Sequence, residues 1–507
     1  MPTEIKHPLP ELSSAEAEEM ILTDLFRSAY RGDGSEWDKQ LATAYERVFG
    51  DEFAVAPPGS DASFPALALY GPPGHGKTSS FISAGQRFCK EMDLRFVFRP
   101  DKDYVRTDRD FVFVSMEMAG EASNVTLGGI PSKDTFTADD GTTHSVMDKL
   151  VDRKFLHLKG AAAGILIFDD FNNAAPVVQN QLLPIAQFRK FQGIDFGRCL
   201  VALTGNLGSA DNTSVYKVSL ALKNRCKQYY FEDNAKDFVN RADKYWSTGS
   251  AGFVRAKDIV TSFISTHEEM FAVSPSDERI SEGDTYASSR SWTALVGELG
   301  QVIGRLEKLG SAAAAKAQKV ASANVGSRVA AEFGSFFYQM ATEALPLARE
   351  IILNGKLEGS KAELLKEKLG NKINAQEQDF SQQFAFALAN NTAEKLIDAM
   401  RNLKGQKKQD ALHELGKHYF VGLNQIESAH QNLSLTRMRS RFENVLGDVL
   451  ETAANGKANE AFFHMATGFE ASAKALGVSG DEYKRFKSNV SNTLAKRDAL
   501  SADKLSM

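Results

Sequence analysis

Cysteine is scarce in this sequence, and a long run of apolar residues is missing from it. Three cysteines occur among 507 residues, they form no CxxC pair, and three thiols cannot all pair with one another. We therefore expect a reducing compartment, the cytoplasm. No apolar run approaches the roughly 18 residues of a membrane helix, and residues 1–20 lack the apolar stretch of a signal peptide. We expect no membrane partner.

An excess of charge of one sign is also missing. The 60 basic and 65 acidic residues give a net charge of −5, so no overall basic field points to nucleic acid, although a local basic groove stays open. Proline is absent after Pro346, while Ala, Leu, Lys, Glu and Gln are abundant there. This composition predicts that residues 325–507 form an all-helical domain.

The stretch that carries the clearest chemistry is residues 66–78. It reads ALALYGPPGHGKT, in which a buried strand runs into a glycine-rich loop and then a helix. The glycines let backbone N–H groups approach phosphate oxygens, the lysine supplies a cation for the β- and γ-phosphates, and the threonine hydroxyl can bind Mg²⁺. We therefore predict ATP and Mg²⁺ as cofactors, with His75 contributing only its backbone. The predicted nucleotide-binding residues are Gly71, Pro72, Pro73, Gly74, His75, Gly76, Lys77, Thr78 and Ser79.

Short apolar runs alternate with helical patterns up to about residue 232. The predicted strands are 66–70, 94–98, 111–116, 164–168, 199–203 and 227–231. This alternation predicts an α/β fold whose parallel sheet is covered by helices on both faces. We also expect residues 1–14 to be loosely attached, two helices within 14–49, and a helix near 144–156.

Polar side chains follow two of these predicted strands. Asp169 and Asp170 come directly after one strand, and Asn206 follows the next strand along the chain. The carboxyl ends of parallel strands meet at one edge of the sheet, where ligands bind in open α/β folds. Asp169 is therefore predicted to hold Mg²⁺ together with Thr78, and Asp170 to take a proton from an attacking water. Asn206 is predicted to place its amide near the γ-phosphate.

The segment 169–183, DDFNNAAPVVQNQLL, resembles the second acidic motif of MoxR-type AAA+ ATPases. Residues 202–206 are similar to the sensor-1 strand of that family, and residues 127–131 are similar to its first pore-facing loop. The resemblance spans about residues 60–300 and implies an AAA+ P-loop NTPase with a helical lid. Its lid sequence also resembles stand-alone AAA+ proteins encoded by bacteriophages, whose location would be the host cytoplasm.

The same resemblance implies roles for two arginines. Residues 221–225 are similar to the segment that carries the family's arginine finger, which gives that role to Arg225, and residues 288–292 resemble the sensor-2 segment, which gives that role to Arg290. A finger completes the site of a neighbouring subunit, so a homo-oligomeric ring, a hexamer, is implied. Asp170 stands where the family has glutamate, which could slow hydrolysis.

Four segments are expected: a helical N-terminal segment (1–60), an AAA+ α/β core (61–232), a helical lid (233–324) and the all-helical C-terminal domain (325–507). The expected function is Mg²⁺-dependent ATP hydrolysis that drives the remodelling of a protein partner, as in MoxR-type chaperones. Two alternatives stay open. One is a DNA-associated motor or loader, and the other is an assembly switch that binds ATP and hydrolyses it slowly.

Three features of the C-terminal half leave alternatives open. Arg437, Arg439 and Arg441 are expected on a solvated helical face, and otherwise in contact with nucleic acid or an acidic partner. The aromatic residues within 333–338 are expected in a core or an oligomer contact. The alanine-rich stretch 311–323 is expected to be a helix or a flexible joint.

Overall fold

A computed structural model of the 507-residue chain describes residues 8–54, 65–120, 125–208, 213–247, 249–272, 284–310, 312–370, 375–451, 464–465, 467–469 and 471–473. These residues form two compact units, one ending at Asn234 and the other beginning at Ala235. The first unit holds the described parts of the segments expected at 1–60 and 61–232, and the second unit holds those of the remaining two segments.

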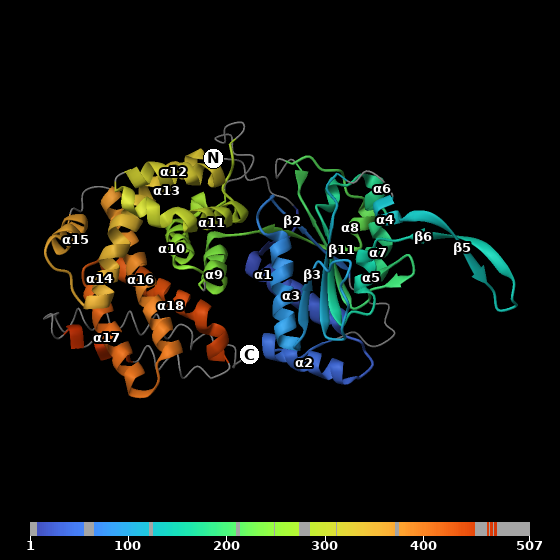
Figure 1. Ribbon diagram of the computed structural model, residues 1–507, viewed down its shortest axis with the longest axis horizontal. Coiled ribbons are helices and arrows are strands. Elements are labelled where there is room, and N and C mark those ends of the chain that lie inside the picture. The colour runs from blue at the N-terminus through green and yellow to red at the C-terminus, as the bar shows by residue number, and fades with distance from the viewer. Residues whose placement is uncertain are drawn as a thin grey trace. The chain divides into compact units, whose positions relative to one another are not determined.

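The first unit is built on a seven-stranded sheet in which every neighbouring pair of strands is parallel (Figure 1). The strand order is β1-β11-β2-β10-β7-β4-β3. The strands are β1 (Glu11–Ser13), β2 (Ala66–Tyr70), β3 (Arg95–Phe98), β4 (Asp110–Glu117), β7 (Ala163–Asp169), β10 (Cys199–Gly205) and β11 (Cys226–Glu232). The predicted α/β class with a parallel sheet is confirmed, and β2 lies between β10 and β11.

Helices cover both faces of this sheet because successive side chains of a strand point to opposite sides. On β2, Leu67 and Leu69 belong to one hydrophobic cluster, and Ala68 and Tyr70 belong to another. The first cluster includes α1 (Ser14–Ala29), α2 (Glu36–Phe49) and α3 (Lys77–Met92), and the second includes α5 (Arg153–Leu158), α6 (Pro176–Gln179) and α7 (Leu182–Phe188). Smaller elements are α4 (Val125–Gly128), η1 (Phe171–Asn173), β8 (Lys190–Phe191), β9 (Ile194–Asp195) and α8 (Leu220–Lys223).

The prediction that residues 1–14 are loosely attached is wrong for Glu11–Ser13. These residues form β1, which pairs in parallel with β11. α1 then begins at a capping box, in which Ser13 and Glu16 exchange hydrogen bonds between side chain and backbone. A strand of three residues is too short to show a periodic pattern, so its distant partner strand decides its conformation.

The prediction of a helix near residues 144–156 is wrong over most of its length. The strands β5 (Ile130–Thr137) and β6 (Thr143–Leu150) form an antiparallel hairpin, and α5 begins only at Arg153. Figure 1 shows this hairpin extending away from the sheet. The hairpin is rich in threonine and β-branched or aromatic residues, which favour strands over helices.

The segment 127–131, which was expected to face a pore, forms the base of this hairpin. Gly129 has a φ of 72°, and a Cβ there would lie 2.4 Å from the carbonyl oxygen of Leu150. Gln192, in the turn between β8 and β9, donates a hydrogen bond of 2.6 Å to the carbonyl oxygen of Gly128. The base is therefore fixed to the α/β unit, while most of the hairpin is exposed.

In the described part of the second unit, every regular element is a helix. The elements are α9 (Ala235–Tyr245), α10 (Ala251–Thr266), η3 (Glu268–Met270), α11 (Ser289–Leu306), η4 (Glu307–Leu309), α12 (Ala312–Val325), α13 (Ser327–Gln339), η5 (Met340–Ala344), α14 (Leu345–Asn354), α15 (Ser360–Gly370), α16 (Ala375–Asn402), α17 (Gly405–Leu423) and α18 (Ser428–Glu451). The predicted helical C-terminal part is confirmed. One hydrophobic cluster extends from Ala235 to Ala473, so the helices expected to form a lid share a core with the C-terminal helices. None of the described helices is long and apolar enough to cross a membrane.

Two alternatives left open by the sequence are decided by this core. The alanine-rich stretch forms the helix α12, which packs against α13 and buries Ala313, Ala317 and Ala321 in this cluster. Phe333 and Phe337 on α13 are fully buried in the same cluster. These aromatic residues therefore belong to the core of the unit.

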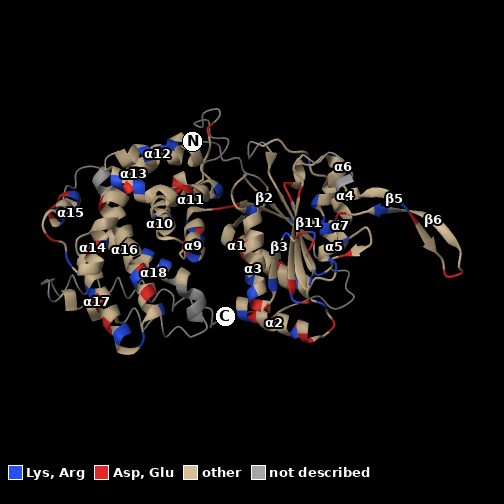
Figure 2. Ribbon diagram, viewed as in Figure 1, with Lys and Arg blue, Asp and Glu red and all other residues tan. Residues whose placement is uncertain are grey.

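The prediction of a solvated face at residues 437–441 is wrong for Arg437 and Arg441. Their exposed fractions are 6% and 2%, although both lie on α18, a helix with many charged residues. Figure 2 shows basic and acidic residues mixed along the helices of this unit. In the sequence, this mixture of charges suggested a helix face exposed to solvent. In the structure, Arg437 and Arg441 instead lie inside the unit.

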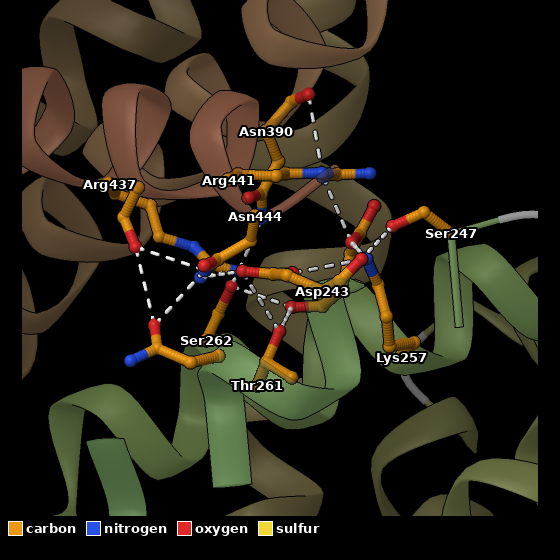
Figure 3. A network of polar contacts seen from close by, with 12 residues as sticks. Asp243, Ser247, Lys257, Thr261, Ser262, Asn390, Arg437, Arg441 and Asn444 are labelled. Atoms are coloured by element: carbon orange, nitrogen blue, oxygen red, sulfur yellow. Dashed lines mark hydrogen bonds and ion pairs between the residues drawn. The ribbon is translucent and has the colours of Figure 1, made fainter. Parts of the chain in front are cut away.

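A buried ionic network joins α9, α10 and α18 (Figure 3). Arg437 forms an ion pair with Asp243, and Arg441 lies 3.0 Å from Asp258. Lys257 links the two pairs, with Nζ at 3.2 Å from Asp243 and 3.0 Å from Asp258. Burial alone would raise the pKa of Asp243, but the surrounding arginines and lysine outweigh it and hold that pKa below its ordinary value.

Candidate nucleotide site

The loop between β2 and α3 requires glycine at its two ends. Gly71 comes directly after β2, and a Cβ there would lie 2.5 Å from the carbonyl oxygen of Phe231. Gly76 has a φ of 91° and precedes Lys77, the first residue of α3. The loop therefore brings the N-terminus of a 16-residue helix, with its unsatisfied N–H groups, to the carboxyl edge of the sheet. Such a helix terminus attracts phosphate.

Lys77 lies over the loop with its ammonium group inside the site. The Nζ atom donates to the carbonyl oxygens of Gly71 at 2.6 Å and Pro72 at 2.9 Å, and to Asn206 Oδ1 at 3.2 Å. The residue is only 7% exposed. These acceptors are uncharged, so an anionic phosphate would bind the ammonium more strongly than they do.

A hydroxyl group and a carboxylate meet at the end of β7. The Oγ1 atom of Thr78 lies 2.9 and 3.0 Å from the two carboxylate oxygens of Asp169. The buried Thr204 on β10 also donates to Asp169, and it accepts a hydrogen bond of 3.2 Å from the backbone N–H of Asp170. The structure thus brings together the two residues that were predicted to hold Mg²⁺.

Asn206 follows β10, and its backbone is held by Asn172, a residue that sequence reasoning missed. The side chain of Asn172 donates to the carbonyl oxygen of Asn206 at 2.6 Å and accepts from its N–H at 3.3 Å. Asn172 is 2% exposed. The one available signal was the asparagine in the acidic motif of the resembling family, two residues after the second acid. Asn172 therefore fixes the backbone of the residue whose side-chain amide contacts Lys77.

Asp170 lies at the same edge in an uncommon backbone conformation. Its φ of 52° and ψ of 39° are left-handed, and it precedes η1. Aspartate and asparagine are among the few residue types that adopt this conformation readily. The backbone conformation at Asp170, which adjoins Asp169, therefore restricts which residue types can replace it.

The side chain of His75 is buried. It is 5% exposed, and neither ring nitrogen has a hydrogen-bond partner among the described residues. Burial lowers the pKa of His75 to about 4, with Asp233 raising it and Lys77 lowering it further. The imidazole is therefore neutral at pH 7. Pro72, Pro73 and Gly74 are partly buried, whereas Ser79 is exposed on the first turn of α3.

Arg225 lies at the opposite edge of the sheet from the phosphate loop. Its carbonyl oxygen accepts from the N–H of Ala66, the first residue of β2, whereas the loop follows the last residue of β2. A five-residue strand separates these ends by about 15 Å. Arg290 is exposed near the start of α11 in the second unit, so its approach to the loop stays a prediction.

The residues present fit ATP and Mg²⁺. In nucleotide sites Mg²⁺ takes one or two protein oxygens, with phosphate and water as the other ligands. Thr78 and Asp169 provide such oxygens next to Lys77. No group of three or more His, Cys, Asp and Glu side chains that could hold a metal ion occurs in the part of the chain that is described.

No family model matches the chain, and no curated protein matches it. Among solved structures, the chain is similar to a point mutant of RuvB from Thermotoga maritima at 12% sequence identity, over 71% of this chain and 85% of that chain. The TM-score is 0.23, which is too low for the likeness to carry an argument.

Proposed function

We propose that this chain is a Mg²⁺-dependent ATPase of the AAA+ type that works as a homo-oligomeric ring, a hexamer, and remodels a protein partner. The observation that carries the proposal is the convergence of Lys77, Thr78, Asp169 and Asn206 at the end of a glycine loop. Three unpaired cysteines support a reducing compartment, the cytoplasm.

The residues of the site then have distinct tasks. Lys77 and the N-terminus of α3 bind the phosphates. Thr78 and Asp169 would hold Mg²⁺, which would neutralise charge on the phosphate oxygens. Asp170 takes a proton from water as the water oxygen bonds to the γ-phosphorus and the bond to the bridging oxygen breaks. Asn206, fixed by Asn172, orients the reacting groups.

The position of Arg225 supports a ring. Because it lies about 15 Å from its own phosphate loop along β2, its guanidinium group can reach a γ-phosphate only in another subunit. Leu220, at the start of the adjoining helix α8, is 82% exposed. An exposed leucine beside a functional arginine favours a surface that a second copy covers.

The hairpin β5–β6 supports a protein partner over nucleic acid. Its register places Ile130 opposite Leu150 and Phe136 opposite His144, so these side chains share one face. Ile130, Phe136 and Leu150 are each more than half exposed. Acidic residues at the tip, which are red in Figure 2, would repel a phosphate backbone. The same face carries the exposed Asp134 between Ile130 and Phe136, so it suits an extended polypeptide with apolar and basic side chains better than a phosphate backbone.

One observation keeps the assembly switch as a second candidate function. The carboxylate of Asp170 is one methylene shorter than that of the glutamate in the resembling family. A shorter reach toward water could leave ATP binding intact while hydrolysis is slow. In that case ATP would act mainly by assembling the ring.

Phosphate release and light scattering, measured together with Mg²⁺ and ATP, test the proposal. The wild-type protein should form rings and hydrolyse ATP, whereas Arg225→Ala should bind ATP and lose about 10³-fold or more in turnover. Lys223→Ala, at the exposed end of α8, is the matched control and should keep activity. Rings without turnover would support the switch, and turnover that requires nucleic acid would support the motor.

A further inference from the structure

Arg225 is held in one orientation by contacts on both its backbone and its side chain. Its N–H donates to the carbonyl oxygen of Leu222 at 3.0 Å, and its carbonyl oxygen accepts from Ala66 at 3.1 Å. The Nε atom donates to Gln187 Oε1 at 2.7 Å, and Nη1 donates to the carbonyl oxygen of Ala221 at 2.8 Å. An exposed arginine ordinarily samples many rotamers, so two side-chain hydrogen bonds restrict it strongly.

These contacts leave part of the guanidinium group open. A guanidinium has five N–H donors in a planar fork, and two of them are used by Gln187 and Ala221. Within the described residues, Nη2 makes no hydrogen bond or ion pair. The free edge of the fork has the geometry that suits phosphate oxygens.

Gln187 is well placed to hold the fork because α7 is anchored. Leu182, Ile185 and Ala186 on that helix are buried in the cluster on one face of the sheet, while Gln187 is only partly buried. The side chain of Gln187 therefore starts from a fixed backbone. No other side chain among the described residues forms a hydrogen bond with Arg225.

We propose that Gln187 is a positioning residue that aims Arg225 at the nucleotide of a second copy of this chain. The inference rests on the proposed function of Arg225, and it adds that turnover in one subunit depends on a glutamine in its neighbour. Gln187 itself touches no nucleotide. Loss of Gln187 should therefore lower turnover in the site of the adjoining subunit and not in the site of its own subunit.

Rings that mix two variants distinguish an effect on the adjoining subunit's site from an effect on the subunit's own site. Arg225→Ala subunits keep an intact phosphate loop, and Lys77→Ala subunits keep an intact arginine, so mixing should restore phosphate release at the shared interfaces. The donor Lys77→Ala/Gln187→Leu should restore about tenfold less activity than Lys77→Ala, as expected when a hydrogen bond to a charged group is lost. Lys77→Ala/Gln228→Leu is the matched control, because Gln228 on β11 donates to the carbonyl oxygen of Lys223 on α8 and not to Arg225.

Two further results decide the proposal. Gln187→Glu keeps an acceptor at the same reach, so the donor Lys77→Ala/Gln187→Glu should restore more activity than the leucine donor, and equal failure of both would overturn the inference. Equal restoration by Lys77→Ala with and without Gln187→Leu would also overturn it, while leaving the role of Arg225 intact. If Lys77→Ala restores nothing although light scattering shows co-assembly, both the proposed finger and this inference are wrong.

Discussion

The buried ionic network of the second unit, which joins α9, α10 and α18, affects the free energy of unfolding of that unit. Asp243 is completely buried, and it lies 3.1 Å from Arg437 Nη2 and 3.2 Å from Lys257 Nζ. At an effective dielectric constant of about 20, each such pair attracts by about 5 kcal/mol, and the cost of removing the ions from water offsets much of this. The net value of the intact network is therefore small.

Removing one charged partner from the network should cost much more stability than the intact network contributes. Asp243→Asn keeps the shape of the side chain but removes one of the buried acids that balance Arg437, Arg441 and Lys257, and leaves Asp258 as their remaining ion-pair partner among the described residues. Removal of one partner from a buried pair costs about 3–5 kcal/mol. We expect a loss of this size in the free energy of unfolding of the helical unit.

Urea unfolding, combined with hydrogen exchange, measures this loss and locates it. Because the network joins α9, α10 and α18, all three helices should lose protection together in Asp243→Asn. Glu358→Gln, which breaks an exposed pair with Lys356 in the same unit, is the control and should leave protection unchanged. If α9 loses protection while α18 keeps it, the expected lid and C-terminal helices do not behave as one body.

The sign of the pH dependence follows from the lowered pKa of Asp243. An aspartate with a depressed pKa in the folded state stabilises the fold above its unfolded pKa of about 3.9. That contribution is lost as the pH falls from there through the lower folded value. Asp243→Asn should therefore differ most from the wild type at neutral pH and least in strong acid.

Three further predictions concern the nucleotide site. Lys77→Ala should abolish ATP binding in calorimetry, while Lys90→Ala at the other end of α3 should bind normally, and equal affinities would show that this loop is not the site. Asp170→Asn should keep ATP bound and lose about 10²–10⁴-fold in hydrolysis, and undiminished turnover would assign the base to another residue. The fold should lose about 3 kcal/mol as the pH falls from 6.5 to 4, because the folded state resists protonation of His75. A His75→Gln variant should lose most of that slope, and an unchanged slope would mean that other groups cause it.

The α/β unit was largely predictable because its signals are local. A strand buried on both faces reads as a continuous apolar run, and the glycine loop fixes where a strand ends and a helix begins. Once the strands were known to be parallel, the meeting of Asp169 with Thr78 and of Asn206 with Lys77 followed from the shared edge. The chemistry of the site therefore came from the order of the motifs.

The misses at β1 and at Arg437 and Arg441 have a common physical cause, which is pairing between residues far apart in sequence. Arg437 contacts Asp243, which is 194 positions away in the sequence. The residues around Arg437 in the sequence give no signal that predicts this partner. A helix face with mixed charges is predicted to be exposed to solvent unless the burial of that helix is already known. The hairpin β5–β6 was missed because most of its side chains are exposed, so alternation between a core face and a solvent face was weak.

The backbone at Asp170 offers a physical account of the aspartate that stands where the resembling family has glutamate. Aspartate tolerates a left-handed conformation because its short side chain can form hydrogen bonds locally, whereas other residues pay about 1–2 kcal/mol there. Asp170→Glu therefore lengthens the reach toward water and strains the backbone at once. If reach limits hydrolysis, turnover should rise while thermal stability falls slightly, and if the site is adapted to aspartate, both should fall. The two measurements together separate a slow ATPase from one whose water is positioned for the shorter acid.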